Sequence, residues 1–180
     1  MIPPIFRRPD PTIAALYGAI VTQARDPRFY DSYGAPDTVL GRFDLIVLHL
    51  ALLLRRLRAG GTSAGTLAQG VFDAFCRDMD HNLREMGIGD QGVPHQMRRV
   101  GEAFYGRAQA YDAALARPDN DALAETLRRN VYAEAADPVA ASGLAAYVRK
   151  AADDLEMQAF DNLMRGVVSF PQPAARAVAE

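Results

Sequence analysis

This sequence of 180 residues has a single cysteine, Cys76. An internal disulfide is therefore excluded, and a lone thiol fits a reducing compartment. Lysine is equally scarce, since Lys150 is the only one among 20 basic residues, and we attribute the arginine enrichment to the source genome rather than to phosphate binding. The net charge of -2 lacks the basic excess of nucleic-acid-binding proteins, so we expect no direct contact with nucleic acid.

The sequence also lacks a segment long enough to span a membrane. Its most apolar run, from Leu45 to Leu54, is about half of the roughly 20 residues that a helix needs to cross a bilayer. Because this run is apolar on every side, we expect a buried helix over residues 43–57 at the centre of the fold. The first residues carry neither a secretory signal nor an arginine-rich transit peptide.

Sequence patterns of catalysis are absent as well. No Gly-x-Ser-x-Gly occurs, and the paired glycines lack the strand or the Gly-Lys that nucleotide-binding loops require. His49 lies in the apolar run, where a hydrogen-bonded core histidine is the usual outcome. Asp78, His81 and Glu85 share one side of a helix, but no second helix carries the Glu-x-x-His pattern of metal-binding bundles. We therefore expect no catalytic residue, no metal and no cofactor.

Helical spacing of apolar residues recurs along the whole chain, without strand alternation or an internal repeat. The pair Asp10-Pro11 is typical of a helix cap followed by a first-turn proline. We expect one all-α domain at residues 10–170, a single-domain bundle of six or seven helices around the central apolar helix, with flexible ends at 1–9 and 171–180. The expected helices cover about residues 10–23, 43–57, 66–86, 94–115, 119–131, 138–155 and 160–164.

The best-specified local structure is a pair of amphipathic helices and their turn, over residues 66–115. Apolar residues recur at intervals of three and four along both arms, so the arms can pack as an antiparallel hairpin. Gly87 can adopt the left-handed conformation that ends the first arm, and Pro94 suits the first turn of the second. Charges four residues apart, such as Asp80 and Arg84, are expected on the solvated face.

Three short motifs surround the turn of this hairpin. Residues 83–87 read Leu-Arg-Glu-Met-Gly, Val93-Pro94 follows, and residues 102–107 read Glu-Ala-Phe-Tyr-Gly-Arg. With these runs in this order, the chain resembles the ubiquinol–cytochrome c reductase assembly chaperones. Residues 36–50, which include Gly-Arg-Phe-Asp and Leu-His-Leu, look like the same family, and the resemblance extends to about Phe170.

The resemblance implies an assembly chaperone and not an enzyme. Family members hold newly made cytochrome b before it joins the bc1 complex, so nascent or unassembled cytochrome b is the expected partner. In mitochondria they act with a small helper protein near the ribosomal exit tunnel, which makes a helper and the ribosome further candidate partners. Without a transit peptide the chain looks like the bacterial form, expected in the cytoplasm or at the periphery of the inner membrane.

A holder of unfinished membrane helices needs an adaptable apolar surface and polar groups that orient the client, and methionine packs against varied shapes. We therefore place the client-binding site at the end of the hairpin. The candidate residues are Arg84, Glu85, Met86, Gly87, Gly89, Asp90, Pro94, Met97, Arg98, Glu102, Tyr105 and Arg107. An alternative interpretation is that Arg84, Glu85, Glu102 and Arg107 form an internal ion-pair network that fixes the hairpin.

Two other functions stay open on the sequence. One is an enzyme with a metal- or haem-binding pocket among the helices. The other is a peripheral membrane module in which Arg55, Arg56 and Arg58 contact anionic lipid, at about 1 kcal/mol per basic residue. The same arginines also suit the carboxyl end of the central helix, where cations interact favourably with the helix dipole.

Overall fold

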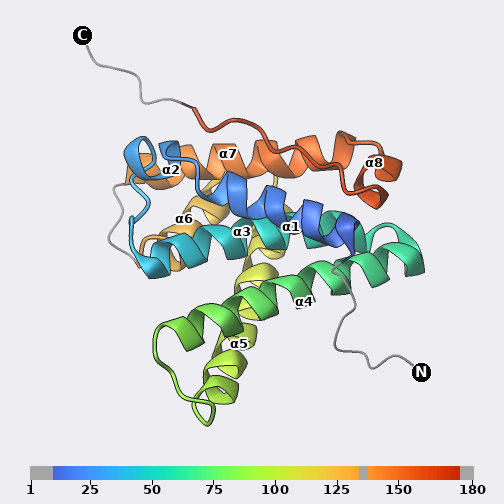
Figure 1. Cartoon of the computed structure of the whole chain (residues 1–180). Helices are drawn as coiled ribbons and strands as arrows, with labels where there is room; N and C mark the ends of the chain where they lie inside the picture. Colours follow the sequence, from blue (N-terminus) through green and yellow to red (C-terminus); the bar gives the residue numbers. More distant parts are fainter. Residues whose placement is uncertain (1–9, 134–137, 175–180) are drawn as a thin grey trace.

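The computed structural model describes residues 10–133 and 138–174, which form six helices of ten residues or more and two short ones (Figure 1). These residues contain no strand, so the predicted all-α bundle is confirmed. The short helix α2 lies after the first helix, where the sequence predicts no helix. The elements are α1 (Pro11–Ala24), α2 (Arg28–Asp31), α3 (Val39–Arg58), α4 (Gly61–Glu85), α5 (Val93–Leu115), α6 (Asp121–Asn130), α7 (Pro138–Met157) and α8 (Phe160–Met164).

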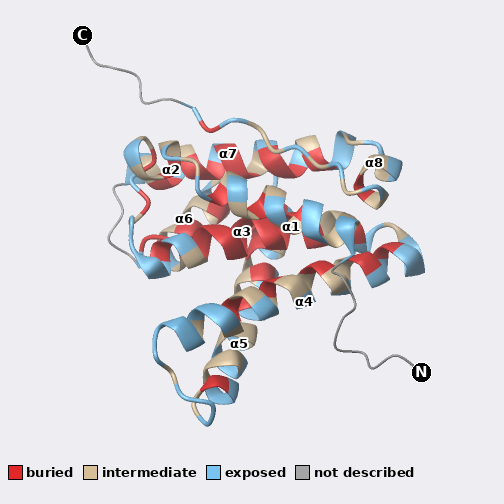
Figure 2. Ribbon diagram, viewed as in Figure 1, coloured by how far each residue is buried: buried red, intermediate tan, exposed pale blue. Residues whose placement is uncertain are grey.

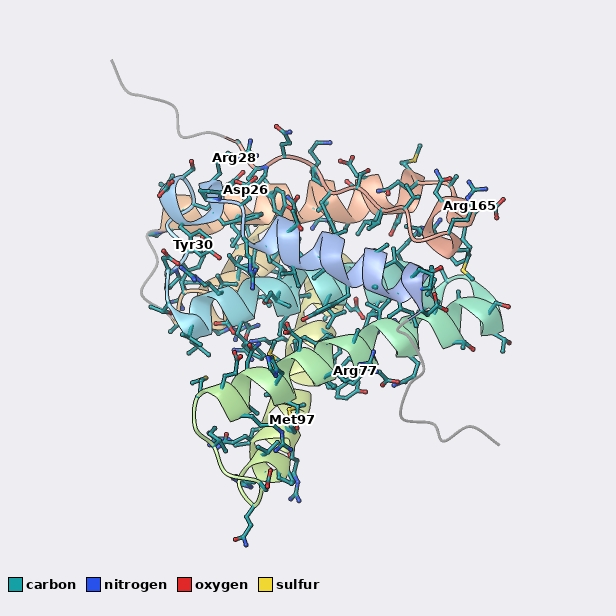
Figure 3. The ribbon with its side chains drawn as sticks, in the orientation of Figure 1. Asp26, Arg28, Tyr30, Arg77, Met97 and Arg165 are labelled. Carbon is teal, nitrogen blue, oxygen red and sulfur yellow. The ribbon has the colours of Figure 1, made fainter. Side chains whose placement is uncertain are left out.

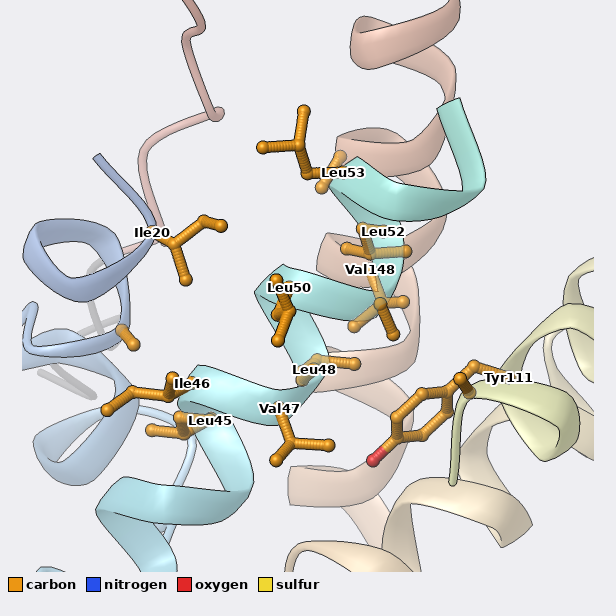
Figure 4. Close-up of a cluster of buried hydrophobic side chains, with 14 of the residues drawn as sticks. Ile20, Leu45, Ile46, Val47, Leu48, Leu50, Leu52, Leu53, Tyr111 and Val148 are labelled. Carbon is orange, nitrogen blue, oxygen red and sulfur yellow. The ribbon is translucent and has the colours of Figure 1, made fainter. Parts of the chain in front are cut away.

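The predicted central helix is α3, which contacts α1, α4, α5 and α7. From Leu45 to Leu57 its apolar side chains are buried, and Figure 4 shows Ile20 of α1, Tyr111 of α5 and Val148 of α7 packed around them. Burial is concentrated in α3 and the inner faces of its neighbours, whereas the end of the α4–α5 hairpin is exposed (Figure 2). Within the described ranges, no helix combines the length and the apolar character needed to cross a bilayer.

The helix α3 begins at Val39, four residues before the start that its apolar run predicts. Thr38 sets this earlier start, because its hydroxyl accepts a hydrogen bond of 3.0 Å from the amide of Gly41. A Cβ atom on Gly41 would lie 1.9 Å from the carbonyl oxygen of Pro36, so only glycine allows the chain to turn into the helix so closely.

Two other helix ends follow the predicted chemistry. The carboxylate of Asp10 accepts a hydrogen bond of 2.8 Å from the amide of Thr12 and caps α1. Gly87 has a φ of 84°, and the amide of Ile88 donates to the carbonyl of Leu83 at 3.1 Å, which closes the end of α4.

His49 is a hydrogen-bonded core histidine, as predicted. Its Nδ1 donates to the Leu45 carbonyl at 2.8 Å, and its Nε2 accepts from the Tyr147 hydroxyl at 2.9 Å. The amide group of Gln23 also donates to the Tyr147 oxygen, at 3.0 Å. Burial lowers the pKa of His49 to about 4, so the imidazole is neutral inside the bundle.

The segment after α8 runs back along the bundle and contacts it as far as Ala174. The amide of Ala174 donates to the Tyr33 hydroxyl at 3.0 Å, and Gln23 donates to the carbonyl of Pro171 at 2.9 Å. Residues 171–174 of the predicted tail are therefore held by hydrogen bonds. The rest of that tail, and the stretch 1–9, lie outside the described residues.

Candidate functional site

The two arms of the hairpin, α4 and α5, contact each other through a cluster of aromatic rings. The ring centroids of Phe72 and Phe104 are 4.9 Å apart, and those of Phe75 and Phe104 are 6.1 Å apart. Phe43 of α3 joins the cluster at 6.2 Å from Phe75. Beyond these rings the end of the hairpin projects away from the bundle (Figure 1).

An apolar groove of about 680 Å³ lies where the first turns of α3 face the end of α4, and we call it the α3–α4 groove. Three of its side chains are large, apolar and mostly exposed: Val39 at 72 %, Leu40 at 62 % and Met86 at 63 %. Such contiguous apolar exposure is typical of a surface that binds another molecule. The other apolar lining residues are Phe43, Ile46, Met79, Leu83 and Val100, and the polar ones are Arg25, Arg42, Asn82 and Glu85.

A second hollow, of about 540 Å³, lies between the end of α3, the first half of α4 and the second half of α5. Phe72 and Tyr105 supply aromatic surface to it, and the two rings are 5.6 Å apart. Arg58 and Asp112 also line it and pair with each other at 2.5 Å. The two charged side chains that line this hollow therefore already pair with each other.

The structure brings only two of the predicted client-binding residues, Glu85 and Met86, into the α3–α4 groove. Tyr105 lies at the second hollow, and Met97 is half-buried within the hairpin (Figure 3). The remaining predicted residues other than Arg107 are exposed at the end of α4, on the turn and on α5: Arg84, Gly87, Gly89, Asp90, Pro94, Arg98 and Glu102.

Arg107, predicted to be an exposed contact, is instead half-buried against α3. Its Nη2 lies 2.8 Å from Oδ1 of Asp44, and its guanidinium stands 5.7 Å from the ring centroid of Phe43. Asp44 is buried, and this burial raises its pKa to about 7 although Arg107 acts in the opposite direction. Arg107 is therefore placed to fix α5 against α3 behind the groove.

The alternative interpretation pairs two arginines with two glutamates of the hairpin, and the structure shows these arginines paired with aspartates instead. Arg84 donates to Asp80 at 2.8 Å, one helical turn away, and also pairs with Asp90 across the turn. Arg107 pairs with Asp44 of another helix. Helix spacing predicts the first of these contacts, whereas the other two depend on how the chain folds back.

The arginines at the end of α3 are engaged within the protein. Arg55 reaches Glu156 at 2.6 Å, and Arg58 reaches Asp112 at 2.5 Å. Arg56 donates to the Leu155 carbonyl at 2.8 Å. These contacts tie α3 to α5 and α7, and lipid binding by the same arginines stays an untested prediction.

The side of α4 that carries Asp78, His81 and Glu85 is also engaged in contacts within the protein. The hydroxyl of Tyr17 donates to Asp78 at 2.7 Å and ties α1 to α4, and burial together with this carboxylate raises the pKa of Tyr17. His81 Nε2 lies 3.1 Å from Glu85. In the part of the chain that the structure describes, no three His, Cys, Asp or Glu side chains gather as metal ligands.

Residues 39 and 40 and the two arginines of the groove were not predicted as site residues. The apolar run predicts a helix start at Phe43, so Val39 and Leu40 were expected to lie in a loop, whereas the helix begins at Val39. A usable signal was present: Thr38 follows Pro36-Asp37 and is a good cap, which would have placed both residues on the exposed first turn. Arg42 follows Val39 by three residues on the same face of α3, whereas Arg25, which follows α1, joins the groove only through tertiary packing.

The fold and the α3–α4 groove together define a class: an all-α protein that presents a peptide-sized apolar groove, a geometry suited to a helical segment of another chain. A family model described as "Ubiquinol-cytochrome C chaperone" matches residues 31–170. The chain belongs to this family, so the resemblance inferred from the motifs is confirmed.

Known relatives agree with this assignment. The chain is 26% identical over 159 residues to the ubiquinol-cytochrome-c reductase complex assembly factor 1 of Xenopus laevis, which covers 87% of this chain and 80% of that protein. Its identity to the Homo sapiens factor is 27% over 161 residues, 88% of this chain but 54% of the human protein. The crystal structure of the Cbp3 homolog from Brucella abortus is similar with a TM-score of 0.84 and 40% identity, over 91% of both chains.

Proposed function

We propose that this chain is a non-enzymatic chaperone that binds newly made cytochrome b in the α3–α4 groove during assembly of the ubiquinol–cytochrome c reductase complex. The observation that carries the proposal is the exposed apolar surface of Val39, Leu40 and Met86 around one groove. Membership of the assembly-chaperone family supports it. The proposed site of action is the cytoplasm or the periphery of the inner membrane.

A membrane protein that has not yet been inserted or assembled exposes helices as apolar as the bilayer requires. Covering such a helix with the groove removes apolar surface of both partners from water, at about 25 cal/mol for each Å² buried. Met79 lies at the buried floor of the groove and Met86 at its exposed lip. Their unbranched thioethers can adapt to several client side chains, which suits a holder that must later release its client.

The charged turn of the hairpin has a supporting role in this proposal. Arg84 pairs with Asp80 and Asp90, and Gly87 ends α4 in the left-handed conformation, so the lip of the groove is held in place. Arg98 and Glu102 lie on the exposed outer face of α5, where they remain candidates for client contact. The proposed client surface therefore extends from the groove over the hairpin end.

The proposal is tested in cells that lack the gene for this chain, with the cytochrome b level and the bc1 absorbance spectrum as readouts. The wild-type gene is expected to restore both, whereas the Leu40→Asp, Met86→Asp double variant is expected to restore neither, because two carboxylates at the lip make the groove polar. The matched control is Met157→Asp with Val167→Asp, since these side chains are also mostly exposed but lie outside the groove. Normal bc1 content in the deletion strain would overturn the proposal.

A further inference from the structure

The polar residues of the α3–α4 groove are separated by sign. Arg25 follows the end of α1, and Arg42 lies in the first turn of α3. Glu85 is the last residue of α4, on the opposing wall. The remaining polar lining residue, Asn82, is neutral. The groove thus has a cationic wall and an anionic wall on either side of its apolar floor.

The charges on both walls are accessible to a bound partner. Arg42 pairs with Asp37 at 2.8 Å, but both side chains are more than half exposed, and such pairs contribute only about 0–1 kcal/mol. No carboxylate of the described residues forms an ion pair with Arg25, which is exposed. Glu85 faces His81 at 3.1 Å, and both are exposed as well. A client's charged groups can therefore replace these weak partners.

We infer that the groove recognises an apolar segment that carries an acidic residue where it passes Arg25 and Arg42 and a basic residue where it passes Glu85. This inference rests on the proposed function and adds to it the chemistry and the orientation of the bound segment. The apolar floor supplies affinity without direction, because apolar contacts are non-directional. The two walls supply the direction, because charge complementarity at a rim selects partners and sets their register.

The groups that face each wall are consistent with this polarity. Asp37 reduces the positive charge at Arg42 but does not remove that of Arg25. On the other wall, Arg84 is directed to Asp80 and Asp90 and so leaves Glu85 as the charge that lines the groove. Because all of these charges are exposed, the selection is expected to weaken as salt screens them.

The inference is tested with two fluorescent peptides that share one short leucine- and alanine-rich helix. One carries two glutamates at one end and two lysines at the other, and the second carries glutamines at these four positions. At low ionic strength we expect the wild-type protein to bind the charged peptide about tenfold more tightly, a preference that shrinks at about 1 M salt, where the screening length is about 3 Å. The Arg25→Glu, Arg42→Glu double variant is expected to lose this preference, because both walls of its groove are then anionic.

The matched control is Arg117→Glu with Arg129→Glu, two exposed arginines outside both the groove and the hairpin end, which is expected to keep the wild-type preference. Equal affinity for the two peptides, no binding of either, or an unchanged preference in the groove variant overturns the inference. Co-purification of cytochrome b with the wild-type protein separates the two claims. Cytochrome b that co-purifies while the peptides show no charge preference leaves the proposed function standing, and its absence counts against the proposed function itself.

Discussion

Asp44 of α3 and Arg107 of α5 form an ion pair inside the bundle, with 2.8 Å between Oδ1 and Nη2 and side chains that are 6% and 19% exposed. The two atoms are close but not aligned for a hydrogen bond, and the Nε of Arg107 and the hydroxyl of Tyr111 are buried without a hydrogen-bond partner among the described residues. The pair joins two of the family motifs. It lies directly behind Phe43, a lining residue of the groove.

Removal of Arg107 is expected to destabilise the fold strongly. In Arg107→Leu the carboxyl of Asp44 stays buried without its cation, and breaking a buried pair in this way costs about 3–5 kcal/mol. The measurement is the free energy of unfolding by chemical denaturation at about pH 9, where Asp44 is ionised in the wild type. Arg98→Leu, a change at an exposed site of the same helix, is expected to stay within about 0.5 kcal/mol of the wild type. Equal values for the two variants would contradict a structural role for the pair.

The stability of the protein is expected to depend on pH through Asp44. Burial raises the pKa of this carboxyl from 3.8 to about 7 in the folded state, so the folded state holds the proton more tightly than the unfolded chain. Its contribution to stability is therefore fully present below about pH 4 and is lost as the pH rises through about 7. In Asp44→Asn that contribution does not titrate, so the wild type should lose stability relative to the variant between pH 4 and 7. A constant difference across this range would show that Asp44 titrates normally.

His49 is expected to make the stability depend on pH in the direction opposite to that of Asp44. Burial lowers its pKa from 6.5 to about 4, so the unfolded chain binds the proton more tightly. Its contribution to stability is present above about pH 6.5 and is lost as the pH falls toward 4. Imidazole nitrogen resonances in an NMR titration should show His49 half-protonated near pH 4, with one neutral tautomer above it. A midpoint near 6.5 would mean that the ring is accessible to water.

Two glycines give a matched test of the start of α3. Gly41→Ala places a methyl group 1.9 Å from the Pro36 carbonyl oxygen, and relieving such overpacking typically costs about 1–3 kcal/mol. Gly18→Ala, in α1, places its methyl group in open space and is expected to stabilise the protein by about 0.5–1 kcal/mol. Thermal denaturation of both variants is the measurement. An unchanged melting temperature in Gly41→Ala would mean that Pro36 does not approach α3 this closely.

Much of the fold could be predicted because local chemistry marks it. Asp10 caps α1, Gly87 ends α4 with a positive φ, and α8 occupies residues 160–164 as its apolar pattern predicts. The central position of α3 followed from an apolar run without a polar face. The helix α2 was missed because a four-residue helix leaves too short a pattern to distinguish it from a turn.

The candidate site was harder to predict because it depends on contacts between distant parts of the chain. The motif residues Glu85 and Met86 do line the groove, but its opposite wall comes from Val39 and Leu40, which no motif marks. Arg107 lies in one of the family motifs, but its pairing with Asp44 was not predicted, because Asp44 lies in another helix. Spacing within one helix carries no information about such a contact.

The central claim is that the α3–α4 groove holds cytochrome b, and site-specific photo-crosslinking tests it most directly. A photoreactive phenylalanine derivative is placed at Leu40, at the lip of the groove, and in a matched strain at Met157, which is 86% exposed and lies outside it. After irradiation of cells that synthesise cytochrome b, the account predicts a covalent product with cytochrome b from position 40 and none from position 157. Crosslinking from position 157 alone, from both positions equally or from neither would contradict it.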